Sequence, residues 1–120
     1  MSYDFENGTP IYLQIIEKIK ADIISKKYLP NEKLPSVREF SMELKVNPNT
    51  VQRALFMLEE EGLIVTEGTT GKFVTEDGEK IEKSKREAQE QTLKAWLDRI
   101  HSLGITNDEI IEFIERGKLE

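Results

Sequence analysis

Isoleucine recurs at every fourth position from residue 11 to residue 23. This spacing predicts an amphipathic helix with one apolar stripe, formed by Ile11, Ile15, Ile19 and Ile23. Thr9 and Pro10 come directly before the stripe, so we expect Thr9 to cap the helix and Pro10 to occupy its first position. A loop at residues 29–31, which contains a proline, ends this first element.

Two more helices follow, and only a brief turn separates them. Ser36 stands three residues before Glu39, which is the spacing of a capping box and predicts the start of the second helix. Asn47 and Pro48 predict the start of the third helix, because an amide cap and a proline at the first position are both favoured there. Gly62 then supplies the left-handed residue that ends many helices. The inner faces of these helices are formed by Val37, Phe40, Leu44, Val51, Leu55 and Leu58.

A pair of short segments rich in β-branched residues comes next, at residues 63–66 and 72–75. They flank residues 67–71, which contain two glycines, so the pattern predicts a small antiparallel hairpin. Three helices, a tight turn between the second and the third, and a hairpin together describe a winged helix-turn-helix. The sequence therefore predicts a mainly α fold.

A helical tail is predicted beyond the hairpin. Residues 76–80 are polar and read as a hinge, and residues 81–103 carry apolar side chains at helical spacing. Another capping box, Thr-x-x-Glu, begins at Thr106 and starts a last short helix, which we expect Gly117 to end. These patterns divide the chain into a winged helix-turn-helix domain at residues 1–77 and a two-helix tail at residues 78–120.

The composition is that of a globular protein without disulfides. Of the 120 residues, 38% are hydrophobic and 33% are charged, which excludes a disordered chain. No apolar run approaches the roughly 20 residues of a membrane span, and the start is acidic where a signal peptide is basic, so we expect a cytoplasmic protein with no membrane contact. With no cysteine and a single histidine, His101, we expect neither a metal site nor a cofactor.

The polar side chains of the third helix are of the kind that reads DNA. The major groove exposes donors and acceptors that amide, hydroxyl and guanidinium groups pair with, and such groups cluster in the first two turns of this helix. The start of the second helix offers a phosphate site, and the glycine of the hairpin permits close approach to a minor groove. The predicted DNA contacts are Ser36, Arg38, Asn47, Asn49, Thr50, Gln52, Arg53, Thr70, Gly71 and Lys72.

The net charge of −6 opposes this interpretation, because affinity for nucleic acid depends on neutralising phosphates. Residues 1–78 alone hold nine Lys and Arg against thirteen Asp and Glu, so the basic charge must be concentrated locally. A winged helix that binds another protein instead of DNA therefore stays an alternative. An enzyme needs a nucleophile with a base, a carboxylate pair or metal ligands, and the sequence offers none of these at the required spacing.

Four motifs of this chain resemble, in order, the DNA-binding domain of GntR-type regulators. They are Leu-Pro-Ser-Val-Arg-Glu-Phe at residues 34–40, Val-Asn-Pro-Asn-Thr-Val-Gln-Arg-Ala-Leu at 46–55, Leu-Glu-x-Glu-Gly-Leu-Ile at 58–64, and Gly-Lys-Phe-Val at 71–74. The opening Pro-Ile-Tyr-x-Gln-Ile and the short tail are similar to the YtrA-like subfamily. The resemblance implies a homodimer on a pseudo-palindromic operator, with DNA contacts at Arg38, Asn49, Thr50, Gln52, Arg53 and Gly71. Glu67 departs from the pattern, since the family often has arginine in the wing.

The tail is too short for a separate effector domain, so we expect it to pair with a second copy of the chain. The alternative is that its apolar residues pack on the first helix of the same chain. The predicted dimer interface consists of Leu93, Trp96, Leu97, Ile100, Ile110, Ile111 and Ile114. The sequence thus predicts a transcriptional repressor that binds double-stranded operator DNA as a homodimer. A small-molecule effector stays open and has no support in the sequence.

Overall fold

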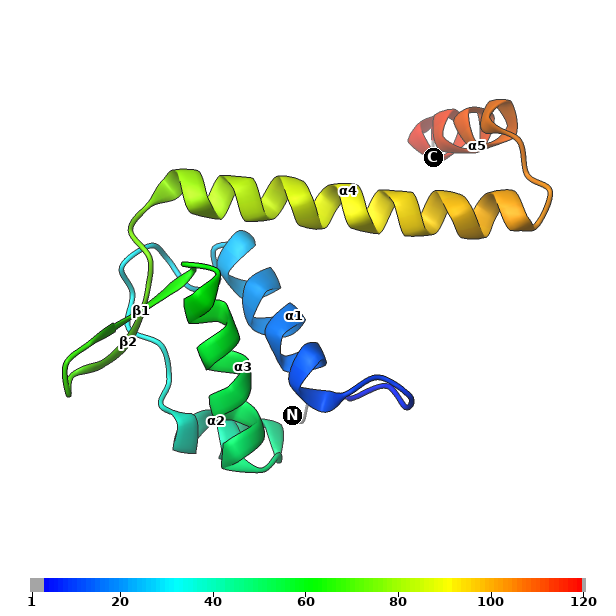
Figure 1. The fold of residues 1–120 in the computed structure, drawn as a ribbon. Coiled ribbons are helices and arrows are strands. Elements are labelled where there is room, and N and C mark those ends of the chain that lie inside the picture. Colours follow the sequence, from blue (N-terminus) through cyan, green and yellow to red (C-terminus); the bar gives the residue numbers. More distant parts are fainter. Residues whose placement is uncertain (1–3, 120) are drawn as a thin grey trace. The chain divides into compact units, whose positions relative to one another are not determined.

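The computed structural model describes residues 4–119 of the chain. These residues form two compact units, which divide after Lys85. The first unit contains three helices and a hairpin in the predicted order, so the mainly α winged helix-turn-helix is confirmed (Figure 1). The elements are α1 (Ile11–Ile24), α2 (Val37–Leu44), α3 (Pro48–Glu60), β1 (Ile64–Glu67), β2 (Gly71–Val74), α4 (Gly78–Ser102) and α5 (Asn107–Leu119).

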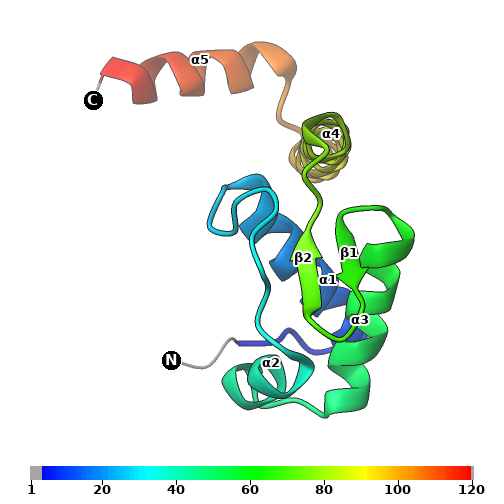
Figure 2. The ribbon, with the colours of Figure 1, turned by 90° about the vertical axis from the view of Figure 1, so that its left-hand side faces the viewer.

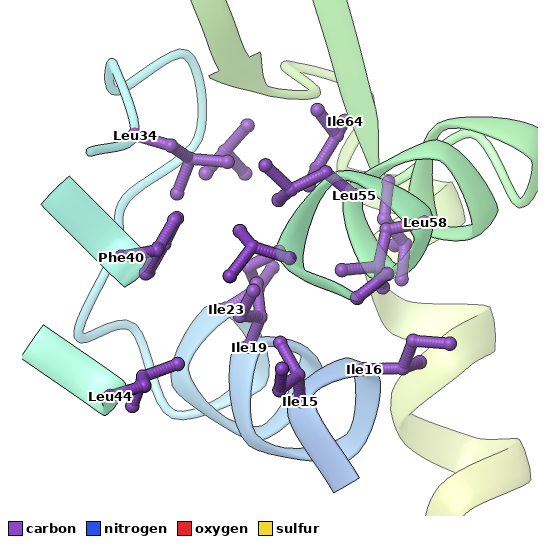
Figure 3. Packing of buried hydrophobic residues seen from close by; sticks show 14 residues of the cluster. Ile15, Ile16, Ile19, Ile23, Leu34, Phe40, Leu44, Leu55, Leu58 and Ile64 are labelled. Carbon is purple, nitrogen blue, oxygen red and sulfur yellow. The ribbon is translucent and has the colours of Figure 1, made fainter. Parts of the chain in front are cut away.

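The core of the first unit lies where α1, α2, α3 and the hairpin meet (Figure 3). Ile15, Ile19 and Ile23 of α1 are almost completely buried there, as their spacing predicts. Burial of one such side chain contributes about 1.5–3 kcal/mol, which makes this stripe a main source of stability. Ile11 differs from the prediction, because it is the first residue of α1 and stays 41% exposed, while Ile16 joins the core.

The start of α1 is held by a glutamine and not by Thr9. Pro10 is the cap residue, and no side chain caps the free amides of the first turn, so the expected Thr9 cap is wrong. Because α1 begins at Ile11, Thr9 lies outside the cap position, and its carbonyl accepts a hydrogen bond from Gln14 Nε2 at 2.9 Å. The buried Gln14 also exchanges hydrogen bonds of 2.7 and 3.0 Å with the backbone of Glu6, which fastens the preceding segment to α1.

A tight turn joins α2 to α3, as the sequence predicts, and Lys45 adopts the left-handed conformation within it. Lys45 has a φ of 57°, and its backbone amide donates to the carbonyl of Ser41 at the end of α2. α3 then begins only three residues later and passes across α2 (Figure 2). Gly62 follows the end of α3 with a φ of +82°, which is the left-handed conformation expected of it.

The hairpin pairs β1 with β2 in antiparallel register, so that Thr66 lies opposite Lys72 and Glu67 lies opposite Gly71. At its base, Ile64 and Val74 are buried in the core, which fixes the hairpin to α3 and α1. The tip of the hairpin is exposed, and it is the wing of the fold.

The segment predicted as a hinge is partly helical. α4 begins at Gly78, so residues 78–80 form its first turn. Asp77 explains the early start, because its Oδ1 accepts the backbone N–H of Glu79 at 3.0 Å and so caps the helix. The functional division between residues 77 and 78 stays a prediction.

α5 starts as predicted but does not stop where predicted. The capping box is present, since Thr106 Oγ1 accepts the N–H of Glu109 at 3.2 Å and the Glu109 carboxylate accepts the N–H of Thr106 at 3.0 Å. The expected stop at Gly117 is wrong, because α5 continues to Leu119. A glycine inside a helix costs only about 0.5–1 kcal/mol, and no proline follows to end the helix.

Candidate DNA-binding surface

α3 has one buried side and one exposed side. The buried side consists of Val51, Ala54, Leu55 and Leu58. The other side carries Asn49, Gln52 and Arg53, which are all exposed, while Thr50 is half-buried. Two amides and one guanidinium therefore face solvent along the first two turns of α3. These are the groups that pair with base edges in a major groove.

The start of α3 favours an anionic neighbour. Asn47 caps the helix, with its Oδ1 accepting the N–H of Asn49 at 2.8 Å, and Pro48 occupies the first turn. No acidic side chain lies in that turn, so the first turn itself does not offset the partial positive charge of the helix N-terminus. The side-chain oxygen of Asn47 accepts the capping hydrogen bond, and the side-chain NH₂ group of Asn47 keeps two donors.

The start of α2 is capped by its own residues. Ser36 Oγ accepts the N–H of Glu39 at 3.1 Å, and the Glu39 carboxylate accepts the N–H of Ser36 at 2.9 Å. The Ser36 backbone amide, and after it the Ser36 side chain, hold the pKa of Glu39 below its ordinary value. Ser36 is therefore tied into the cap, whereas Arg38 is exposed and, among residues 4–119, takes part in none of the ion pairs.

Lys72, the predicted cation of the wing, is bound to α3. Its Nζ donates to Thr66 Oγ1 at 2.8 Å and lies 3.6 Å from Glu59 Oε1. The Thr66 hydroxyl in turn donates to the Glu59 carboxylate. Sequence reasoning missed Glu59 and Thr66, although the hairpin register that places Thr66 opposite Lys72 was available as a signal.

A shallow depression between the start of α2 and the wing brings four predicted residues together, namely Ser36, Thr70, Gly71 and Lys72. Lys33 lines the same depression and was not among the predicted contacts. Gly71 has a φ of +136°, and a Cβ built on it would lie 3.0 Å from Cε of Lys33. A larger residue at this position would therefore be strained and would press on Lys33.

Arg53 rests on an aromatic ring of α1. Its guanidinium carbon lies 3.7 Å from the centroid of the Tyr12 ring. Tyr12 is half-buried and packs against the core, so the ring is a fixed support. The sequence alone missed Tyr12, because its distance along the chain from Arg53 hides the contact.

Across residues 4–119, no three His, Asp or Glu side chains are grouped as metal ligands would be. None of the helices described combines the length and the apolar composition that crossing a membrane requires.

The fold and this surface define a winged helix-turn-helix protein. The family model for bacterial regulatory proteins of the gntR family matches residues 11–74, which is more than half of the chain. The chain belongs to the gntR family of bacterial regulatory proteins.

Similar proteins extend the likeness to the tail. The HTH-type transcriptional regulator YhcF of Bacillus subtilis (strain 168) is 36% identical over 115 residues, which are 96% of this chain and 95% of that protein. The HTH-type transcriptional repressor YtrA of the same organism is 34% identical over 113 residues, covering 93% of this chain and 87% of YtrA. The resemblance to the YtrA-like subfamily is thus confirmed. These relatives are named as regulators of transcription and not as enzymes, in agreement with the prediction.

Solved structures agree with this assignment. A GntR family transcriptional regulator from Listeria monocytogenes is 38% identical with a TM-score of 0.87, and the match covers 93% of this chain and 98% of that one. AraR(DBD), solved in complex with operator ORX1, is 27% identical with a TM-score of 0.57, and the match covers 62% of this chain and 99% of that one.

Proposed function

We propose that this chain is a transcriptional repressor that binds a pseudo-palindromic operator as a homodimer, with α3 in the major groove. The observation that carries the proposal is the exposed face of α3, where Asn49, Gln52 and Arg53 face solvent and the first turn of the helix holds no acidic residue. Asn and Gln pair bidentately with adenine, and Arg pairs with guanine or a phosphate. Asn47 and Thr50 complete this reading surface.

The phosphate backbone takes the contacts on either side of α3. Arg38 is exposed at the first turn of α2, where it faces a phosphate together with the capped Ser36. On the wing, Thr70 and Gly71 approach the minor groove. Lys72 contributes to DNA binding only to the extent that its ammonium group leaves the Glu59 carboxylate. The net charge of −6 is compatible with this arrangement because the acidic residues lie elsewhere than the first turn of α3.

The tail supplies the surface that binds a second copy of the chain. α4 has no buried residue among those described, and Leu93, Trp96 and Ile114 are 62%, 60% and 58% exposed. Apolar surface of this extent is stable in water only when another surface covers it. A second copy of the chain covers this apolar surface symmetrically. The resulting dimer places its two α3 helices one DNA turn apart. The interface of this proposal consists of Leu93, Trp96, Leu97, Ile100, Ile110, Ile111 and Ile114.

The similar proteins support the operator and the repressor role. AraR(DBD) was solved with an operator, and YtrA is named a repressor. We place the protein in the cytoplasm, where bacterial operators are. A small-molecule effector has no support among the described residues, and the proposal does not include one.

The experiment is a titration of fluorescent duplex DNA at several salt concentrations, with an operator selected by the protein from a random-sequence pool. We expect log affinity to fall steeply with log salt, and Arg38→Ala and Arg53→Ala to weaken binding about tenfold or more. Arg86→Ala removes the same charge from α4 and is the matched control. Absence of any selected sequence, with weak binding that ignores salt, would instead favour a winged helix that binds protein.

A further inference from the structure

The position of Arg53 in the free protein is fixed by Tyr12. The guanidinium carbon lies 3.7 Å above the centre of the Tyr12 ring, which is the distance of a stacked cation–π contact. Arg53 itself is exposed and takes part in none of the ion pairs among residues 4–119. A guanidinium that lies over a ring can make this contact with its flat face, which leaves its N–H edge available to donate.

The support under Arg53 is part of a regular contact between two helices. Tyr12 and Lys20 lie eight residues apart on α1, and Arg53 and Glu61 lie eight residues apart at α3, so each pair stands on a row of every fourth residue. Tyr12 contacts Arg53 at one end of the rows, and Lys20 Nζ lies 2.9 Å from Glu61 Oε2 at the other. Ile16, only 7% exposed, lies between them on α1. The register of the two helices therefore sets the position of the ring.

We propose that Tyr12 is a positioning residue for DNA recognition, which holds the Arg53 guanidinium flat on its ring so that the N–H edge meets the operator already oriented. This inference rests on the proposed function, because it assigns Tyr12 a role only if Arg53 contacts DNA. Arginine loses much rotamer freedom when it is immobilised, and a group immobilised before binding does not lose that freedom again on the DNA. The same ring excludes water from one face of the cation, which strengthens its hydrogen bonds to a base or phosphate.

A double-mutant cycle measures this coupling directly. Operator affinity is determined for the full-length protein and for Tyr12→Leu, Arg53→Ala and the double variant, with thermal unfolding as the check on folding. We expect Tyr12→Leu to weaken binding about threefold to tenfold in the natural background, and to have no further effect once Arg53→Ala is present. Tyr12→Phe keeps the ring face and should bind within about twofold of the natural protein.

Two more variants keep the test decisive if Tyr12→Leu folds poorly. Arg53→Lys retains the charge without the flat group, and we expect it to lose about as much affinity as Tyr12→Leu. Lys20→Met removes the ion pair at the far end of the same helix contact but leaves the buried Ile16 to hold the register, so we expect operator affinity to be unchanged.

Each contrary result has a defined meaning. If Tyr12→Leu weakens binding equally with and without Arg53, or if Tyr12→Phe is as damaging as Tyr12→Leu, Tyr12 acts through packing or through its hydroxyl and the inference is overturned. It is also overturned if Arg53→Ala binds normally while Asn49→Ala and Gln52→Ala do not, although the proposed function then stands. If all three of those α3 variants bind normally, the proposed function itself fails.

Discussion

Lys72 reaches from the wing to α3, where its ammonium group is shared between the Thr66 hydroxyl and the Glu59 carboxylate. A cation held in this way is available to DNA only in part, since the carboxylate offsets its charge at short range. We therefore expect the wing to be a weaker electrostatic anchor for DNA than its sequence indicates. We expect Glu59 to set that strength from a position outside the predicted surface.

Glu59→Gln tests this balance. Removing the carboxylate frees Lys72 for a phosphate, so we expect affinity for any duplex to rise about threefold to tenfold at low salt, and the salt dependence to steepen by about 0.9 in log–log slope. Glu17→Gln removes the same charge from an exposed position of α1 and is the control. Equal behaviour of the two variants would show that Lys72 does not reach the DNA.

The Glu39 cap gives a pH dependence with a known sign. The Ser36 backbone amide and then its hydroxyl lower the pKa of Glu39 in the folded protein from the ordinary 4.5. Since the folded pKa is the lower one, the cap stabilises α2 above pH 4.5, and this stability is lost as the pH falls through the folded pKa. Thr106 lowers the pKa of Glu109 in the same way.

An NMR titration of the carboxyl carbons checks both caps at once. We expect Glu39 and Glu109 to titrate below the ordinary value, and Ser36→Ala to raise the pKa of Glu39 alone. The Glu109 signal serves as the control within the same sample. A Glu39 pKa at its ordinary value in the natural protein would show that the capping box is absent in solution.

At the scale of the elements, the sequence predicts what local chemistry decides. The capping boxes at Ser36 and Thr106, the Asn47 cap and the left-handed Gly62 are all present because each depends on residues within one turn. The errors have local causes as well. Asp77 caps α4 and turns an expected hinge into helix, and Gly117 continues a helix that it was expected to end.

Gly62 and Gly78 form a matched pair for stability. Gly62 has a φ of +82°, and a Cβ there would lie 3.2 Å from Cδ of Lys80, so we expect Gly62→Ala to lower the free energy of unfolding by about 1–2 kcal/mol. Gly78 lies in the first turn of α4 with open space around it, so Gly78→Ala should be neutral or raise stability by up to about 1 kcal/mol. Urea unfolding measures the free energy of unfolding of both variants. Equal values for Gly62→Ala and Gly78→Ala would contradict the left-handed helix end.

At the scale of the whole molecule, the exposed face of α3 was predictable because the positions of Val51 and Leu55 fix the buried side and leave Asn49 and Gln52 outside. The side chains that lie against this face from other elements, such as Tyr12, were not predictable. Tyr12 lies about forty residues from Arg53 along the chain, and periodicity within one helix carries no information on which side chains meet across two.

Trp96→Asp tests the proposed dimer. A charge in an apolar interface should weaken self-association at least about a hundredfold, so sedimentation equilibrium should give the mass of one chain, 13.9 kDa. Leu29→Asp alters another exposed apolar residue, outside the helices, and should leave the dimer intact. An unchanged dimer mass for Trp96→Asp would place the interface elsewhere.

A competition between the selected operator and a scrambled duplex of equal length measures whether the exposed face of α3 reads the sequence of the DNA. We expect the natural protein to prefer the operator about a thousandfold or more. The Asn49→Ala/Gln52→Ala variant should lose at least about tenfold of that preference while keeping its affinity for the scrambled duplex. If this variant retained the full preference for the operator, the exposed face of α3 would not be the part that reads the DNA sequence.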